Sequence, residues 1–181
     1  TIEEGPQGIP TQRQVDDAVA PLCKAITQES NSADAFVIAC FSDPGLYSAR
    51  EITNKPVFGI GMSSFAQATL MGERFGIIAI LEQSTVRQRR AVRLTGFESR
   101  YAGSLPIGVG AEELEGDKVR DRMVEVGQTL IETNGADVLI MGCAGMACYR
   151  THIERTLGVP VIDPSQAAAI QAMAAVRLAR A

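Results

Sequence analysis

Two similar apolar segments, each ending in a cysteine, limit how this chain can fold more than any other feature. Residues 33–40 read Ala-Asp-Ala-Phe-Val-Ile-Ala-Cys, and residues 136–143 read Ala-Asp-Val-Leu-Ile-Met-Gly-Cys. Short, continuous apolar runs of this kind are typical of strands that are buried on both faces of a parallel sheet. Each run is followed by turn residues, a helical segment and a second strand that starts with Pro-Val, at Pro56 and at Pro160. The repeat therefore predicts two similar units of strand, helix and strand.

The rest of the chain continues this alternation of strands and helices. Apolar runs predict strands at 33–40, 56–60, 75–81, 105–109, 136–143 and 160–162. Amphipathic or Ala-rich stretches predict helices at 13–29, 46–53, 63–74, 84–94, 118–133, 151–157 and 165–180, and we expect Pro21 to kink or break the first of them. The predicted fold class is α/β, with parallel-type sheets flanked by helices.

The composition excludes several classes of protein. The chain has 181 residues, of which 46% are hydrophobic, and its net charge is −4. That hydrophobic content is too high for a disordered chain, and no apolar run reaches the length of a membrane-spanning helix. The acidic balance argues against a nucleic-acid partner. No secretory leader is visible, so we expect a cytoplasmic protein whose four cysteines are free thiols.

Cys40 and Cys143 are the candidate catalytic residues. Both follow the carboxyl end of a predicted strand, which is where ligands bind in open α/β sheets. A turn and a helix come next in each case, and we expect the helix N-terminus to favour the thiolate and to lower the thiol pKa from about 8.5 toward neutrality. If the two units face each other, the thiols approach one pocket from opposite sides. Such a pair suits inversion of a C–H next to a carbonyl, because one thiolate can remove the proton while the other thiol returns one to the opposite face.

Three segments resemble the cofactor-independent aspartate/glutamate/hydantoin racemase superfamily, and most of all its hydantoin and allantoin racemases. They are Ala-Cys-Phe-Ser-Asp-Pro-Gly-Leu at 39–46, Met-Gly-Cys-Ala-Gly-Met at 141–146 and Gly-Val-Pro-Val-Ile-Asp at 158–163. The resemblance implies a racemase or epimerase, an isomerase that needs no cofactor, with Cys40 and Cys143 as its acid/base pair. It also implies that the backbone after each cysteine binds a small-molecule substrate, through Phe41, Ser42, Ala144 and Gly145.

The same resemblance implies two similar lobes related by a pseudo-twofold axis, with the active site between them. Residues 1–62 and 163–181 would form the first lobe, and residues 63–162 the second. Family members usually begin with a strand that ends in Asn-Pro-Asn-Ser or Asn-Pro-Asn-Thr, and this sequence contains no such segment. We therefore expect the first strands of the first lobe to be missing from it. A homo-oligomer is the expected assembly.

The exact substrate stays open at this stage. Many members of the hydantoin branch carry Thr-Thr at the end of the third strand, where this chain has Ala79-Ile80. Hydantoin, allantoin and amino-acid-type compounds are all candidates. Two other interpretations also stay open. One is a decarboxylase or a cis–trans isomerase on the same scaffold, although cysteine-based decarboxylases resemble racemases that have lost the first cysteine. The other is a catalytically silent binding protein.

Other reactive side chains suggest no second site. The spacing of Cys143, Cys148 and His152 could hold a metal ion, but a structural zinc site normally needs four ligands, so we expect none. We expect Cys148 to be a small packed residue and His152 to lie on the surface or in an interface. No lysine follows a buried strand as a Schiff-base lysine would, so no cofactor is expected. A basic run is expected to be a solvated helix face or a subunit contact, and it comprises Arg87, Arg89, Arg90 and Arg93.

Overall fold

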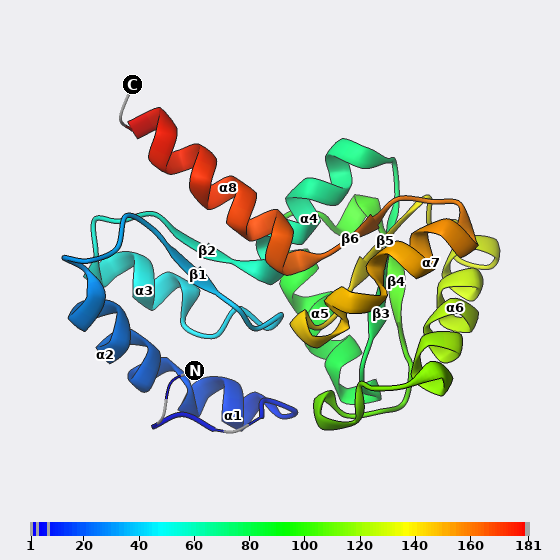
Figure 1. Ribbon diagram of the computed structural model, residues 1–181, viewed down its shortest axis with the longest axis horizontal. Coiled ribbons are helices and arrows are strands. Elements are labelled where there is room, and N and C mark those ends of the chain that lie inside the picture. Colours follow the sequence, from blue (N-terminus) through cyan, green and yellow to red (C-terminus); the bar gives the residue numbers. More distant parts are fainter. Residues whose placement is uncertain (1, 3, 7, 180–181) are drawn as a thin grey trace.

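Two parallel sheets form the framework of the computed structural model, which describes residues 2, 4–6 and 8–179 (Figure 1). The smaller sheet pairs β1 (Phe36–Ile38) with β2 (Val57–Gly59). The larger sheet has the order β4-β3-β5-β6, formed by β3 (Phe75–Ala79), β4 (Tyr101–Pro106), β5 (Val138–Met141) and β6 (Val161–Ile162). Every strand pairing among the described residues is parallel. The predicted α/β class is therefore confirmed.

Helices flank both sheets. They are α1 (Gln12–Asp17), α2 (Val19–Glu29), α3 (Leu46–Ile52), α4 (Ile60–Met71), α5 (Glu82–Leu94), α6 (Asp117–Glu132), α7 (Arg150–Leu157) and α8 (Pro164–Ala179). Three short 3-10 helices join them, namely η1 (Glu98–Arg100), η2 (Ala111–Glu113) and η3 (Ala144–Tyr149). Among the described helices, none combines the length and the apolar character that crossing a bilayer requires.

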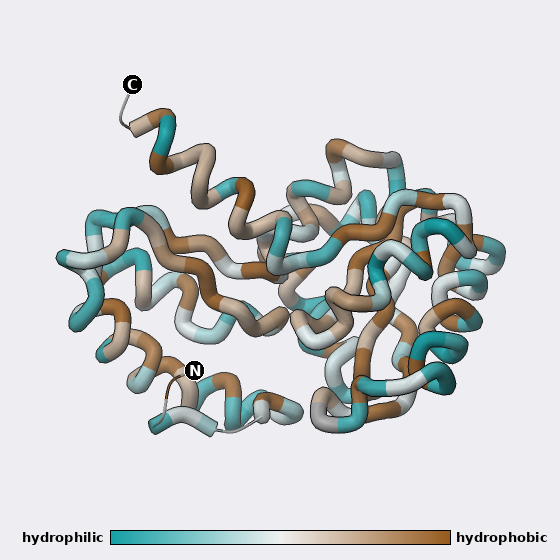
Figure 2. Tube along the Cα trace, in the orientation of Figure 1, coloured by the Kyte–Doolittle hydropathy of each residue, from teal (hydrophilic) through white to brown (hydrophobic). Residues whose placement is uncertain are grey.

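The larger sheet is buried on both faces, which explains its unbroken apolar strands. On β5, Val138 and Ile140 pack with Phe65 of α4, on the side that α5 also covers. Leu139 and Met141 alternate with them and pack under α6 and α7. Side chains alternate between the faces of a strand, so a strand covered on both sides must be apolar at every position. In Figure 2 the strands of this sheet, in the right-hand half of the view, carry the brown colour of hydrophobic residues.

The first predicted helix is broken as expected, one turn before Pro21. Ala18 separates α1 from α2, whereas Pro21 is the third residue of α2. The first N–H groups of a helix have no intrahelical acceptor, so a proline in the first turn loses no hydrogen bond. Pro21 is therefore compatible with a regular α2. A proline clashes with the helical carbonyl four residues earlier, here that of Asp17, so the predicted break is confirmed and lies one turn before Pro21.

Strand β4 begins and ends earlier than the apolar pattern suggested. The prediction was 105–109, and the strand is Tyr101–Pro106. All six of its residues are half-buried, and they include Gly103 and Ser104, so neither alternation nor an apolar run marks this edge strand. The segments 33–40 and 136–143 are also longer than the strands they contain, and both cysteines lie just beyond the paired residues.

Helices α4 and α8 connect the two sheets. They pack against each other, α4 contacts strands of both sheets, and α8 reaches from the end of β6 to β1 and β2 (Figure 1). The side-chain amide of Gln171 on α8 donates a hydrogen bond to the carbonyl of Ser63 on α4, at 3.0 Å. The two sheets thus share one connecting layer. The proposed lobes, with boundaries after residues 62 and 162, stay a prediction.

Candidate active site

A cavity of about 470 Å³ lies where the carboxyl ends of strands from both sheets meet. This is the size of a small-molecule site and the position at which open α/β sheets bind ligands. Its walls follow β1 at residues 39–42, β3 at 80–81, β4 at 110–111 and β5 at 142–144. Three residues of α5 and four residues near the start of the chain complete the lining: Ser84, Arg87, Gln88, Pro6, Gly8, Ile9 and Pro10.

Cys40 and Cys143 both line this cavity, and the backbone after each makes the same two hydrogen bonds. In each case the N–H two residues further on, from Ser42 and from Gly145, donates to the cysteine sulfur. The N–H three residues further on donates to the cysteine carbonyl, at 2.9 Å for Cys40 and 3.2 Å for Cys143. The sequence repeat therefore corresponds to a repeated local structure that presents a thiol to one cavity twice.

The residues expected to bind substrate divide into two groups. Phe41, Ser42 and Ala144 line the cavity beside the cysteines. Gly145 is exposed and does not line the cavity. Its backbone N–H donates a hydrogen bond to the sulfur of Cys143. Three of the four are thus placed where a ligand could reach them.

An aromatic side chain packs the turn after Cys40 against the core of the larger sheet. Phe41 is 8% exposed and packs in the cluster that contains Phe65 and Phe75. Its ring meets that of Phe65 edge-on, with 5.9 Å between the centroids. Although Cys40 follows a strand of the smaller sheet, the core of the larger sheet therefore determines its position.

Asp43 provides a second attachment for the same turn. Its carboxylate accepts the N–H groups of Gly61 and Met62 at the start of α4, at 2.8 and 2.7 Å. Burial raises the pKa of Asp43 to about 6, against the opposing effect of these two hydrogen bonds and of Arg50. A Cβ on Gly59 would overlap the Asp43 carboxylate, so a glycine is required where β2 ends. Asp43 itself has a φ of 47°, which fits a tight turn.

The pKa values of the two thiols are shifted in the direction opposite to our expectation. Burial raises the pKa of both Cys40 and Cys143 and outweighs the N–H donated to each sulfur. The first α-helix after Cys40 begins only at Leu46, and Cys143 precedes a 3-10 helix. Neither thiol therefore has the α-helix N-terminus directly behind it that the prediction assumed. The charges of Asp43 and Cys143 further raise the pKa of Cys40, whereas Arg87 lowers it.

These shifts predict the pH dependence of thiol reactivity. We expect iodoacetamide to alkylate Cys40 and Cys143 slowly at pH 7 and faster as the pH rises beyond 9, because only the thiolate reacts and burial disfavours it. Mass spectrometry of the modified peptides, with an unstructured cysteine-containing peptide as the reference thiol, measures both rates. A half-maximal alkylation rate at a lower pH for either cysteine than for that peptide would contradict the assignment.

The polar residues of α5 in the cavity were not anticipated. Arg89, Arg90 and Arg93 are exposed, as expected for a solvated face, but Arg87 turns inward and donates to the carbonyl of Pro10 at 2.9 Å. The expectation of a wholly solvated basic run was therefore wrong for Arg87. Ser84 and Gln88 share its helix face, since positions three and four apart lie together. The spacing of Ser84, Arg87 and Gln88, three and four residues apart, was the only feature of the sequence that indicated this wall of the cavity.

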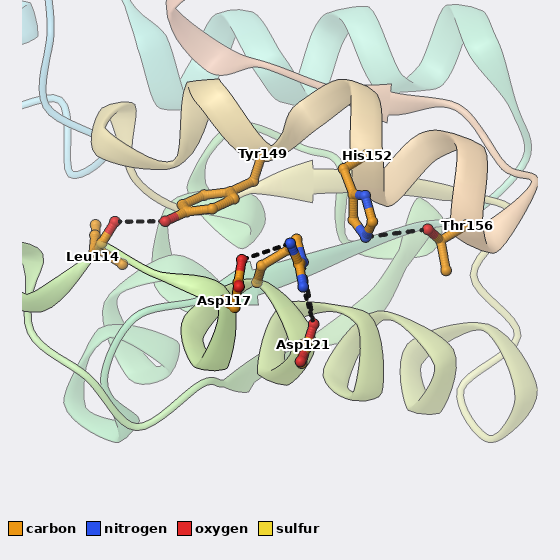
Figure 3. Close-up of polar contacts among 7 residues, drawn as sticks. Leu114, Asp117, Asp121, Tyr149, His152 and Thr156 are labelled. Carbon is orange, nitrogen blue, oxygen red and sulfur yellow. Dashed lines mark hydrogen bonds and ion pairs between the residues drawn. The ribbon is translucent and has the colours of Figure 1, made fainter.

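His152 and Cys148 lie apart from the cavity lining. The His152 ring on α7 is exposed, with its Nε2 atom 3.4 Å from the hydroxyl of Thr156 (Figure 3). Cys148 is also exposed, which corrects the expectation that it packs, because Met146 fills the buried position of η3. Within the described part of the chain, no three His, Cys, Asp or Glu side chains are grouped so as to hold a metal ion.

Comparison with known proteins places these observations in a family. A family model described as Asp/Glu/Hydantoin racemase matches residues 1–172. A hydantoin racemase from Pseudomonas sp. (strain NS671) is 37% identical over 137 residues, which is 75% of this chain and 55% of that protein. The chain thus spans a little over half the length of this relative.

Solved structures agree with that match. Allantoin racemase from Klebsiella pneumoniae superimposes with a TM-score of 0.92 at 28% identity, covering 98% of this chain and 74% of that one. Allantoin racemase from Pseudomonas fluorescens gives a TM-score of 0.94 at 25% identity, covering 99% of this chain and 77% of that one. With a family match over almost its whole length, the chain belongs to the Asp/Glu/hydantoin racemase family.

Proposed function

We propose that this protein is a cofactor-independent racemase or epimerase that inverts a carbon next to a carbonyl by proton transfer between Cys40 and Cys143. The observation that carries the proposal is the pair of thiols in one cavity, each with the same N–H donated to its sulfur. Two equivalent groups are what inversion needs, because the reaction must run equally well from either enantiomer. A sulfur-to-sulfur distance of about 6–10 Å would leave room for a planar substrate between them.

The proposed reaction balances without any other reagent. One thiolate takes the proton, so a C–H bond breaks and an S–H bond forms, and the electron pair moves onto the neighbouring carbonyl oxygen as an enolate. The second thiol then gives its proton to the opposite face of the carbon and becomes a thiolate. The enzyme is left ready for the other enantiomer. The N–H groups of Ser42 and Gly145 support this cycle, since each stabilises the thiolate form of one sulfur.

For the substrate we propose a hydantoin, an allantoin or a related amino-acid derivative. The names of the relatives support this choice, since they include hydantoin racemases and allantoin racemases. Their substrates carry an acidic C–H between a nitrogen and a carbonyl, and abstraction of such a proton gives a planar enolate that can be protonated on either face. The cavity volume of about 470 Å³ suits a molecule of this size.

The test is to incubate single enantiomers of a small panel of 5-substituted hydantoins and of allantoin with the protein in deuterium oxide. We expect the circular dichroism signal to decay to zero and the recovered product to carry one deuterium at the inverted carbon. Unchanged optical activity without deuterium uptake would instead identify a silent binding protein. Release of carbon dioxide from a malonate-type acid, without racemisation, would favour the decarboxylase.

Two further proposals concern the setting of the enzyme. We propose the cytoplasm as its location, which is supported by the free state of all four cysteines. We also propose a homo-oligomer. Exposed apolar residues on α8 support it, namely Ile170, Met173 and Leu178, which are 59%, 55% and 78% exposed.

A further inference from the structure

Arg87 is the only charged side chain that lines the cavity in the described part of the chain. Among the described residues, no Asp or Glu lines the cavity, and none forms an ion pair with Arg87. Removing a charge from water is unfavourable unless an opposite charge lies nearby. This half-buried guanidinium has no carboxylate partner, so the anion that it faces must come from elsewhere. The two cysteines of the same cavity supply one whenever either of them is a thiolate.

Two segments of the chain hold the Arg87 guanidinium at the wall of the cavity. Its Nη1 atom donates to the carbonyl of Pro10 at 2.9 Å, and to the carbonyl of Gln83 on its own helix at 3.4 Å. Pro10 also lines the cavity, so the segment that precedes α1 forms part of this wall. Beside it lies a smaller hollow of about 180 Å³, which Arg87 lines together with Phe41. Arg87 therefore borders the turn that follows Cys40.

The proposed reaction keeps one negative charge in the cavity at every stage. The charge begins on one thiolate, passes to the enolate oxygen and ends on the other thiolate. Apart from the two thiols and Arg87, the described lining is uncharged, so no other side chain there can balance it. We infer that the guanidinium of Arg87 is the counter-ion of this charge as it moves between Cys40 and Cys143. The inference rests on the proposed function and adds a third side chain to it.

The counter-ion needs no direct contact with the substrate. Electrostatic attraction extends over several ångströms where water is largely excluded, and an arginine stays protonated throughout. Burial is the main cause of the raised pKa of Cys40, the charges of Asp43 and Cys143 raise it further, and Arg87 lowers it. Asp43 does not line the cavity, and its carboxylate accepts two N–H groups at the start of α4. Arg87 is therefore the one described charge on the cavity side of Cys40 that favours its thiolate.

The test measures how fast iodoacetamide alkylates Cys40 as the pH is raised, in the wild-type protein and in Arg87→Met, Arg87→Lys and Arg90→Met. The reagent is uncharged, so the loss of a positive charge does not change its attraction to the protein. Methionine removes the charge and keeps an unbranched apolar stem, whereas lysine keeps the charge. Arg90 provides the matched control, because it is exposed on the same helix and its charge lies near Arg87. It donates to the side chain of Gln12 at 3.2 Å and does not line the cavity.

We expect Arg87→Met to raise the pH of the half-maximal alkylation rate of Cys40 by about one pH unit, at the lower end of the effect of a nearby opposite charge. Arg87→Lys should restore at least half of that difference, and Arg90→Met should match the wild type. A merely structural role predicts the opposite sign, because a loosened contact with Pro10 would expose Cys40, whose pKa is raised by burial. An unchanged or lower midpoint in Arg87→Met overturns the inference, and so does an equal shift in Arg87→Lys or Arg90→Met.

A second readout separates this inference from the proposed function. Exchange of the C5 protons of hydantoin with deuterium oxide at pH 7, followed by NMR, reports proton transfer itself. Arg87→Met should exchange about tenfold more slowly than the wild type, because a pKa higher by about one pH unit lowers the thiolate population tenfold. Exchange by Arg87→Met at the wild-type rate, with unshifted alkylation, would overturn the counter-ion and support the racemase. Alkylation that shifts as expected, in a wild-type protein that exchanges no deuterium, would support the counter-ion of Cys40 and overturn the racemase.

Discussion

Replacing either Cys40 or Cys143 by serine is expected to lower the rate of racemisation by at least about 10³-fold. Both thiols line the cavity, and the proposed mechanism uses one as base and the other as acid in every turnover. A serine hydroxyl is a poor base without a partner to activate it, and positioned acid/base groups contribute on the order of 10²–10⁴-fold each. Initial rates from circular dichroism, at equal concentrations of folded protein, measure the effect.

The chain supplies a matched control for these two variants. Cys148 is an exposed thiol outside the cavity lining, so Cys148→Ser should racemise at the wild-type rate. Near-normal racemisation by Cys40→Ser would show that Cys143 alone carries the chemistry. The decarboxylase interpretation would then become the stronger one.

Phe41→Ala is expected to lower the free energy of unfolding by about 3 kcal/mol, at the lower end of the range for a buried phenylalanine because the ring also borders the cavity. The ring is 8% exposed and packs on Phe65, so its removal leaves a hole between the turn after Cys40 and the larger sheet. For a domain of this size, a loss of that order lowers the melting temperature by about 6–12 °C. Thermal unfolding followed by circular dichroism measures it.

Tyr47→Ala is the control for the loss of an aromatic ring. Tyr47 is 60% exposed, so its replacement should change the free energy of unfolding by less than about 0.5 kcal/mol. Equal melting temperatures for Phe41→Ala and the wild type would mean that the packing of Phe41 does not stabilise the turn after Cys40. The position of Cys40 would then need another explanation.

The elements predicted best from the sequence are those that their own residues identify. Strands β3 and β5 are covered on both faces, so each is a continuous apolar run that can be recognised without knowing its neighbours. The edge strand β4 is half-buried throughout and carries Gly103 and Ser104, so its start was misplaced. The break between α1 and α2 falls at Ala18, and Pro21, three residues further on, was its sequence signal.

The candidate site was predictable only in part, for a related reason. The repeat located Cys40 and Cys143 at strand ends, where open α/β sheets bind ligands. Because β1 and β5 belong to different sheets, only the packing of the two sheets brings both cysteines to one cavity. The pKa shifts of these thiols depend on burial by distant segments, which no local pattern reports. Ser84 and Gln88 are polar positions on an amphipathic helix, which usually face solvent. Only the packing of the sheets places them at 5% exposure beside the cysteines.

The claim that two thiols act on opposite faces of one carbon is tested most directly by proton exchange in the single variants. Each enantiomer of a 5-substituted hydantoin is incubated in deuterium oxide with Cys40→Ser and with Cys143→Ser, and deuterium at C5 is measured by NMR. We predict that each variant exchanges one enantiomer only, and that the two variants choose opposite enantiomers, because each retains one thiolate on one face. Exchange of both enantiomers by one variant and of neither by the other would contradict the account, since a single base would then serve both faces.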